Sequence, residues 1–252
     1  MKMHFAVGPD VDKPVKIYEV IAADFSPVDE GGFIKVGNDI AVLHLKDAVE
    51  GVTPIAVADA SMSSGDVGQA FVAVGFGSRT VEEAGYGMYP GKRVAGAVTV
   101  HAVGGQSYKA LFGTWQIYYD FMVWLYGQDT VEIAIDIIKG WWNDVVLLPG
   151  YEIHVGGRKG DAQLCFGDEG APLIGPESGV RKIFGVASSN WFSEKSACDS
   201  GTFFATFGPE TRAMIERASQ STVRPSEAAR TLTVDEVRKR IATLRRHPLH
   251  ER

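Results

Sequence analysis

The chain has 252 residues, of which 45% are hydrophobic and 22% are charged, and its formal net charge at pH 7 is −6. This length suits one sizeable core or two small ones, and the acidic balance argues against a nucleic-acid-binding protein, which usually carries a basic excess. No run of about 18 apolar residues occurs, so we expect no membrane-spanning helix.

Short strand-like runs recur along the chain and are separated by glycine-rich turns. The chain contains 29 glycines. Apolar residues at every second position are typical of half-buried strands, and short apolar runs are typical of buried ones. The pattern predicts strands at residues 4–7, 15–21, 39–45, 70–77, 95–101, 131–137 and 182–187. So many short strands favour an all-β barrel or sandwich.

The last part of the chain changes to helical spacing. Residues 209–217 begin with a proline, which fits the first turn of a helix, so we expect one short helix there. Residues 219–252 form a polar linker followed by Thr233–Ile241, a run with the pattern of a capped, basic amphipathic helix. We expect this tail to be solvated, and the alternative is that it docks on a partner.

Cysteine and histidine are few. Cys165 and Cys198 lie far apart in the sequence, which is compatible with a disulfide, half of a metal site or two unrelated core thiols. Metal-ligand spacing is not found among His101, His154, His247 and His250. We therefore expect neither a metal nor another cofactor.

Four segments, in chain order, resemble landmarks of the trypsin/chymotrypsin family of serine endopeptidases. Residues 38–43 (Asn-Asp-Ile-Ala-Val-Leu) resemble the segment with the catalytic aspartate, and residues 74–77 (Val-Gly-Phe-Gly) resemble a strand end that reads Gly-Trp-Gly in the family. Residues 165–174 are similar to the signature Cys-x-Gly-Asp-Ser-Gly-Gly-Pro-Leu, except that Glu169 replaces serine and Ala171 replaces glycine. The pocket wall, its disulfide partner and the closing helix are matched by residues 185–188, Cys198, residues 201–203 and residues 209–217.

The resemblance implies a fold. It predicts two packed six-stranded antiparallel β-barrels with a C-terminal helix over residues 1–218, and it leaves open whether the first barrel is complete. Residues 104–149 exceed the family's usual length and are rich in Trp and Tyr, so we interpret them as an insertion. A Cys165–Cys198 disulfide is also implied, and with it a secreted or periplasmic protein. Residues 1–4 do not show the pattern of a signal peptide.

The same resemblance assigns the candidate site. Asp39 matches the aspartate of the catalytic triad, Glu169 stands at the position of the nucleophilic serine, and Gly167 supplies an amide to the oxyanion hole. Asp168 matches the aspartate that, in the family, pairs with the new amino terminus after activation. The specificity pocket is matched by Gln163, Ser188 and Gly201.

The histidine of the triad has no match. His4 is the only histidine before Asp39, and its neighbours do not match the family's Thr-Ala-Ala-His-Cys-like segment, so we interpret His4 as a strand residue. Either the natural start lies upstream of Met1 or the first strands are lost together with the histidine. Because an unpaired sheet edge promotes aggregation, we also consider a partner chain that supplies or covers the missing strands.

These substitutions decide the predicted function. A carboxylate at position 169 has no proton for a histidine to remove and is a poor nucleophile in peptide cleavage. We therefore predict a catalytically inactive serine-endopeptidase homologue that binds a protein or peptide as a regulatory module. We hypothesise that the Glu169 carboxylate turns toward the amides of Gly167 and Glu169, and the alternative is that it points into solvent.

Two other functions stay open. One is an active secreted trypsin-like hydrolase, in a longer form or with another nucleophile such as Ser188 or Ser189, or with Glu169 and Asp39 as an acid–base pair. The other is a structural domain whose aromatic-rich insertion packs against a neighbouring chain.

Overall fold

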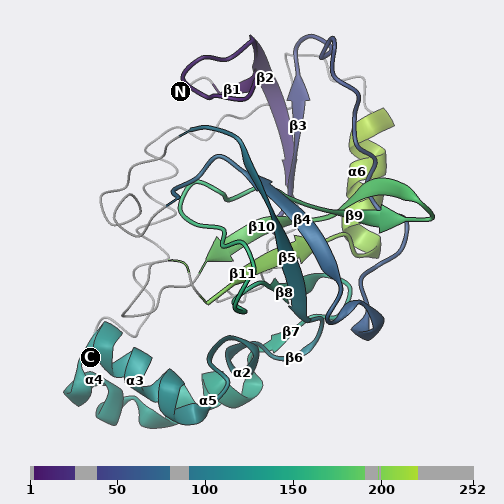
Figure 1. The fold of residues 1–252 in the computed structure, drawn as a ribbon. Helices are drawn as coiled ribbons and strands as arrows, with labels where there is room; N and C mark the ends of the chain where they lie inside the picture. Colours follow the sequence, from purple (N-terminus) through teal and green to yellow (C-terminus); the bar gives the residue numbers. More distant parts are fainter. Residues whose placement is uncertain (1–2, 26–38, 80–90, 191–197, 199, 221–252) are drawn as a thin grey trace.

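The computed structural model describes residues 3–25, 39–79, 91–190, 198 and 200–220, and these residues are mostly β (Figure 1). Six antiparallel strands close into a barrel in the order β10–β11–β8–β5–β4–β9, and β9 pairs back to β10. The barrel strands are β4 (Ala70–Gly75), β5 (Val94–Ala102), β8 (Glu152–Val155), β9 (Pro172–Glu177), β10 (Val180–Asn190) and β11 (Thr202–Thr206).

Apolar side chains that alternate along the strands fill the barrel. On β4, Phe71 and Ala73 are buried while Val72 is exposed, because successive strand residues point to opposite faces of a sheet. The Phe71 ring meets Phe184 of β10 edge-on, with ring centroids 5.1 Å apart. Side chains without any solvent exposure reach the core from four different strands, as Val98, Ile153, Leu173 and Phe204.

Two barrel strands, β8 and β11, are buried on both faces along their whole length. The outer face of β11 is covered in part by the C-terminal helix α6 (Pro209–Gln220), where Ala205 packs with Met214. It is covered further along by Leu147, which packs against Phe203. Strands covered on both sides lose the apolar–polar alternation, so the sequence pattern did not predict them.

The N-terminal strands form a separate three-stranded antiparallel sheet in the order β1–β2–β3. Its strands are β1 (His4–Val7), β2 (Lys16–Phe25) and β3 (Ala41–Leu45). Just before β3, Ile40 is buried against Met214 of α6 and Ala205 of β11, so this end of the sheet is fixed to the barrel. Within the described residues, the sheets are therefore one closed barrel, this three-stranded sheet and one short two-stranded pair.

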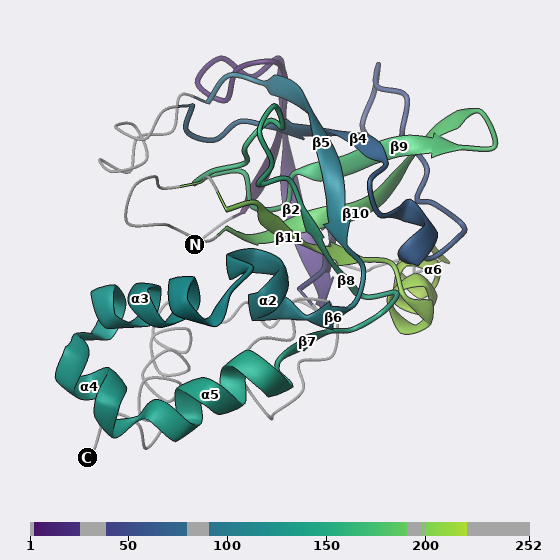
Figure 2. The ribbon, with the colours of Figure 1, turned by 60° about the horizontal axis from the view of Figure 1, so that its bottom comes forward.

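Four helices project from one end of the barrel (Figure 2). They lie between the paired strands β6 (Gly105–Gln106) and β7 (Val146–Leu147). The helices are α2 (Ser107–Phe112), α3 (Trp115–Tyr126), α4 (Gln128–Ile133) and α5 (Ile135–Asp144). We call residues 107–144 the helical group.

The helical group has an aromatic core of its own. Tyr118 is fully buried and stacks on Trp142, with ring centroids 5.3 Å apart, and Trp115 meets Trp142 edge-on at 5.9 Å. Val131 and Ile138 complete the buried cluster from α4 and α5. The aromatic residues predicted to form an insertion therefore serve mainly to pack these helices together.

One predicted strand is wrong. Residues 131–137 belong to α4 and α5, although their apolar residues alternate. Val131 is buried on α4, and Ile138 and Trp142 are buried on α5, four residues apart as on one face of a helix, while Ile133 is 88% exposed. The alternation arises because exposed isoleucines lie between the buried positions.

The other predicted elements are confirmed. The strands expected at residues 4–7, 15–21, 39–45, 70–77, 95–101 and 182–187 correspond to β1, β2, β3, β4, β5 and β10, and the helix expected at residues 209–217 is α6. Residues 221–252, which include the predicted tail helix, lie outside the described residues. No helix in the described part of the chain is long and apolar enough to cross a membrane.

The disulfide is also confirmed. Cys165 and Cys198 are bonded, their Cα atoms are 5.2 Å apart, and both residues are buried. The bond joins the turn before β9 to the segment before β11. This cross-link closes a loop of the barrel beside the residues predicted to form the site.

Candidate functional site

A hydrogen bond joins the N-terminal sheet to the barrel at two predicted site residues. Ser188 on β10 donates its hydroxyl hydrogen to Asp39 Oδ2, just before β3, at 2.7 Å. The Asp39 side chain is exposed and that of Ser188 is half-buried. The structure thus brings together the position matched to the triad aspartate and one matched to the pocket wall.

Residues 165–171 form a tight turn, which we call the Glu169 turn. The backbone N–H of Gly167 donates to Glu169 Oε2 at 2.9 Å. Gly167 has φ of +87°, in the left-handed region that favours glycine, and this conformation turns its amide toward the side chain two residues on. The carboxylate of Glu169 is exposed, yet it folds back over its own turn.

Backbone hydrogen bonds fix the Glu169 turn to β10. The Gly170 amide donates to the Ala187 carbonyl at 2.7 Å, and the Ala187 amide donates to the Ala171 carbonyl at 2.9 Å. Ala187 directly precedes Ser188, so the Glu169 turn and the Asp39–Ser188 pair are anchored to adjacent residues of one strand. The candidate site therefore lies where β3, β10 and the turn before β9 meet.

Asp168 points into the protein, opposite to its neighbour Glu169. Its carboxylate accepts hydrogen bonds from the Gly77 amide at 2.7 Å and from the Cys165 amide at 2.9 Å. A Cβ atom on Gly75 would lie 1.8 Å from Asp168 Oδ1, and one on Gly77 would lie 2.5 Å from the Phe166 carbonyl oxygen. The glycines at the end of β4 and just after it are therefore needed so that the backbone can approach this buried carboxylate.

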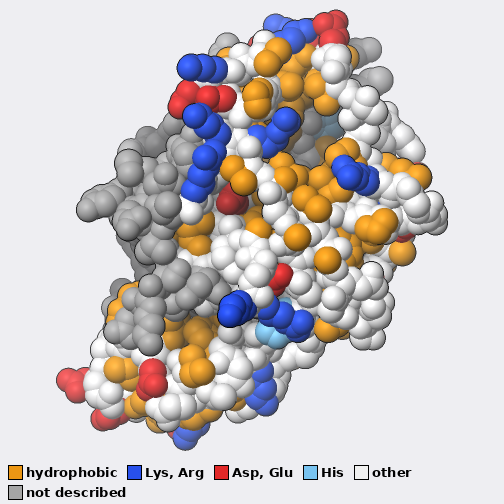
Figure 3. Space-filling model, viewed as in Figure 1, with side chains coloured by type: hydrophobic (Ala, Val, Ile, Leu, Met, Phe, Trp, Pro, Cys, Tyr) orange, Lys and Arg blue, Asp and Glu red, His pale blue; other side chains and the backbone are white. Residues whose placement is uncertain are grey.

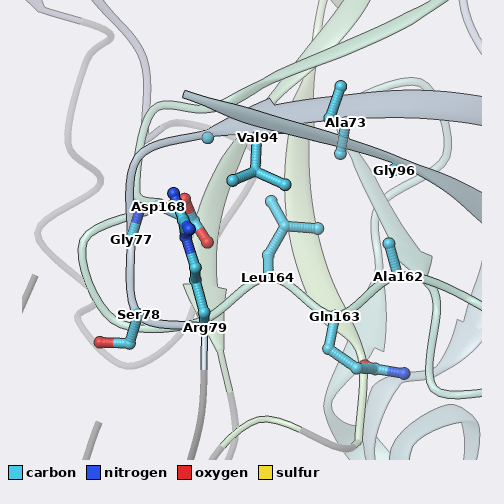
Figure 4. A pocket seen from close by; sticks show the side chains of 12 residues that line it. Ala73, Gly77, Ser78, Arg79, Val94, Gly96, Ala162, Gln163, Leu164 and Asp168 are labelled. Atoms are coloured by element: carbon cyan, nitrogen blue, oxygen red, sulfur yellow. Dashed lines mark hydrogen bonds between the residues drawn. The ribbon is translucent and has the colours of Figure 1, made fainter. Parts of the chain in front are cut away.

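A cavity of about 240 Å³ opens beside Asp168 (Figure 4). Figure 4 shows Arg79 reaching toward Asp168, with Leu164 and Val94 between them and the opposite wall. Gln163 lines the same cavity, but its side chain points away from Asp168 in this view. Gln163 and Asp168, matched by sequence to two different functions, thus border one cavity.

Gly201 lies against a pair of histidines. Its φ is +85°, and a Cβ atom there would lie 2.7 Å from His154 Nε2. His154 Nε2 is 2.8 Å from the Ser200 carbonyl oxygen, and its Nδ1 is 3.2 Å from Nδ1 of His101. Because a carbonyl only accepts, His154 carries its proton on Nε2, and His101 must donate from Nδ1 to the bare Nδ1 of His154.

Burial favours the neutral form of both histidines. Loss of solvation lowers the pKa of His154 to about 4, and the charge of His101 acts in the same direction. The pKa of His101 is also lowered, first by burial and then by Arg158, while Asp161 opposes the change. The sequence did not predict this pair, because no local motif links residues on β5 and β8.

The described histidines do not complete a catalytic triad. His44 contacts Asp24 at 2.7 Å, His101 and His154 contact each other, and His4 is exposed on β1. Within the described part of the chain, no histidine is hydrogen-bonded to Asp39 or Glu169. The same residues contain no group of three or more His, Cys, Asp or Glu side chains that could hold a metal ion.

No protein-family model matches the chain, and no curated protein matches it in sequence. Fold and site together define a six-stranded antiparallel barrel protein with a disulfide-linked turn, in which an exposed carboxylate caps a backbone amide. The function has to be argued from that geometry.

Proposed function

We propose that this chain is a catalytically inactive relative of trypsin-like serine endopeptidases that binds a protein or peptide in a site beside the Glu169 turn. The observation that carries the proposal is the hydrogen bond from the Gly167 amide to Glu169 Oε2 at 2.9 Å. In acyl transfer, backbone amides of such a turn hold the oxyanion of the tetrahedral intermediate. The Glu169 carboxylate already places a negative oxygen on one of these donors.

The chemistry of the site supports inactivity. Glu169 stands where the serine nucleophile of the family would be, and its carboxylate has no proton to give up. Loss of the serine from a triad typically costs on the order of a millionfold in turnover. A carboxylate that occupies the amide of the oxyanion hole also competes with any substrate carbonyl.

The remaining parts of the fold support a binding protein. The three-stranded sheet β1–β3 occupies the place of a first barrel in this proposal, and Asp39 and Ser188 mark the boundary between the sheet and the closed barrel. A peptide bound along this boundary would meet β10 beside Ser188. The Cys165–Cys198 disulfide favours an oxidising compartment, so we place the protein outside the cytoplasm or in the periplasm.

A second candidate is an active hydrolase that uses Ser188. It is favoured by the hydrogen bond from the Ser188 hydroxyl to Asp39 at 2.7 Å, which pairs a possible nucleophile with a carboxylate base. A base with a pKa near the working pH is much more effective for this proton transfer, and such a base is usually histidine. The residues present therefore agree better with an inactive homologue than with an active hydrolase.

The first test is reaction with a fluorophosphonate probe, followed by intact mass measurement. We expect no adduct on the wild-type chain under conditions in which active trypsin is fully labelled. An adduct that disappears in Ser188→Ala would establish the hydrolase instead. The Glu169→Ser variant shows whether the rest of the machinery is present, since labelling of that variant requires an activating base.

The second test is binding of peptides from a casein digest to the immobilised chain, followed by mass spectrometry of the bound material. We expect retained peptides to be recovered uncut. Ser188→Trp fills the boundary beside Asp39 and should reduce retention about tenfold, a loss of about 1.4 kcal/mol. The matched variant Val180→Trp, on an exposed hairpin end, should retain peptides as the wild type does. Equal retention by both variants would place binding elsewhere.

A further inference from the structure

The end of the helical group farthest from the barrel carries exposed apolar side chains. Trp124, Leu125 and Tyr126 end α3 with 49%, 47% and 49% of their surfaces exposed, Ile133 on α4 is 88% exposed, and Ile137 on α5 is 43% exposed. We call these five residues the tip surface. Figures 1 and 2 both show α4 at the far end of the group, away from the barrel strands.

The tip surface belongs to a projecting part of the molecule. Helix α4 has six residues, so it is only about 9 Å long. It connects the end of α3 to the start of α5, which places the exposed apolar side chains at both of its ends (Figure 2). A projection does not enclose a small ligand, whose sites are usually concave. It suits a partner that is concave or that deforms around it.

The core of the helical group does not require these side chains to be apolar. That core is the buried cluster around Tyr118, Val131 and Trp142, to which the tip surface adds little because its side chains are about half exposed or more. Leu125 lies one helical turn beyond the buried Phe121, so the apolar side of α3 continues past its own core. Apolar side chains gathered in this way on a surface indicate an interaction site.

The types of side chain on the tip surface match the boundary of a lipid bilayer. Trp124 and Tyr126 each combine an apolar ring with a polar N–H or O–H, and such side chains favour the level of the lipid headgroups. Leu125 and Ile133 are purely apolar and gain most by contact with acyl chains. A bilayer also deforms around a projecting surface, which a rigid protein face does not.

The charges around the tip surface restrict the kind of lipid. Residues 115–144 contain five acidic residues and one basic residue, namely Asp120, Asp129, Glu132, Asp136 and Asp144 against Lys139. Among the described residues, none of these carboxylates forms an ion pair. Figure 3 shows acidic and apolar side chains beside one another on this part of the molecule, at the lower left.

This acidic border favours a zwitterionic membrane over the other partners. An anionic lipid surface would repel the carboxylates. A second copy of the chain, packed tip to tip, would set two acidic borders against each other. The quaternary ammonium group of phosphatidylcholine is instead attracted both by carboxylates and by the faces of Trp and Tyr rings.

We propose that the tip surface binds zwitterionic phosphatidylcholine membranes, with Trp124, Leu125 and Ile133 inserted at the headgroup boundary and the carboxylates of Asp129 and Glu132 among the choline groups. This inference is independent of the proposed function, because the Glu169 turn and the Asp39–Ser188 pair contribute no residue to the tip surface.

Flotation of the full-length chain with phosphatidylcholine vesicles tests the proposal. We expect the wild-type chain to float with the vesicles at millimolar lipid and to float less when phosphatidylserine is added to them. Ile133→Glu places a charge at the most exposed position of the tip surface and should weaken binding about tenfold or more. The matched control is Val180→Glu, which changes an exposed apolar residue on the β9–β10 hairpin and should bind as the wild type does.

A fluorescence measurement identifies the part of the chain that enters the membrane. Phosphatidylcholine with brominated acyl chains should quench part of the tryptophan fluorescence of the wild-type chain. Trp124→Phe should remove this quenching, while its vesicle binding stays within about threefold because phenylalanine keeps an apolar ring. Unchanged hydrogen exchange in the barrel strands checks that each variant folds.

Four outcomes would overturn the proposal. The first is no flotation with phosphatidylcholine vesicles, and the second is stronger flotation when the vesicles contain phosphatidylserine. The third is binding or quenching that survives Ile133→Glu and Trp124→Phe, which would place the contact elsewhere on the chain. The fourth is self-association without lipid that Ile133→Glu abolishes, which would assign the tip surface to a second copy.

Discussion

The barrel and the helical group build their cores in different ways. The barrel core combines Val98, Ile153, Leu173 and Phe204, which come from four strands far apart in the sequence. The core of the helical group comes from one continuous stretch of the chain, and its buried cluster contains none of the barrel residues. It joins the barrel through the β6–β7 pair and the small cluster around Leu147 and Phe203.

The candidate site needs a rigid barrel but not a rigid helical group. The Glu169 turn depends on strands that meet only when the whole barrel is formed, because it is fixed to Ala187 of β10 and to Gly77 after β4. The helical group contributes no residue to that turn among the described contacts. We therefore expect damage to the helical group to remain local and damage around Asp168 to reach the candidate site.

The largest expected effect is that of Trp142→Ala. Trp142 is buried among Trp115 and Tyr118, and Lys109 lies over its ring at 5.9 Å. Removing it should destabilise the helical group by about 4 kcal/mol. Hydrogen exchange should show lost protection in α2–α5 with β4, β5 and β10 still protected.

The control for this prediction is Ile117→Ala on the exposed side of α3, where Ile117 is 54% exposed, and its effect should stay within about 0.5 kcal/mol. If Trp142→Ala unfolds the barrel strands together with the helices, the two regions form one cooperative unit and the comparison fails.

Gly75→Ala should have the next largest effect and should act on the barrel. The new Cβ would lie 1.8 Å from Asp168 Oδ1, so the carboxylate must move away from the Gly77 and Cys165 amides. Overpacking together with these lost hydrogen bonds should cost about 3 kcal/mol in urea unfolding. Gly104→Ala, where the nearest atom is Pro149 Cγ at 3.7 Å, is the control and should be nearly neutral. Equal stabilities of the two variants would contradict the packing argument.

Strand positions could be predicted where one face of a strand is buried and the other exposed. Alternation located β5, and an apolar run that ends in glycines located β4; two of these glycines, Gly75 and Gly77, lie against Asp168. The same rule failed at Val131–Ile137, because helical spacing with exposed isoleucines between buried residues also alternates. It failed at β8 and β11 because both their faces are covered.

The candidate site could be predicted only in part. The pairing of Cys165 with Cys198 followed from the family resemblance, and the structure confirms it. The contact between Ser188 and Asp39 joins residues 149 positions apart, and no local pattern encodes such a distance. The direction of the Glu169 side chain stayed undecided between the turn and solvent, because it depends on the positive φ of Gly167.

The smallest of the three effects concerns pH and the wall that carries Gly201. His154 has a pKa of about 4 in the folded chain against an ordinary value of 6.5, so between these values the unfolded chain binds more protons. Stability should therefore be unaffected above about pH 6.5 and should fall as the pH drops toward 4, by about 2 kcal/mol at pH 4.5. The lowered pKa of His101 adds a loss of the same sign, and Arg158 and Asp161 are the charged groups that influence it.

The hydrogen bonds determine the order in which the two histidines are protonated. The first proton can go to Nε2 of His101 without breaking the pair, whereas a proton on Nδ1 of His154 would set two donors against each other at 3.2 Å. Urea unfolding from pH 7.5 to 4.5 should show a steeper loss for the wild type than for His154→Gln, with exposed His4→Gln as the control. If stability depended on pH equally in the wild type and in His154→Gln, the proton affinity of the pair would not change on folding. Ser200–Gly201 would then keep its position through that pH range.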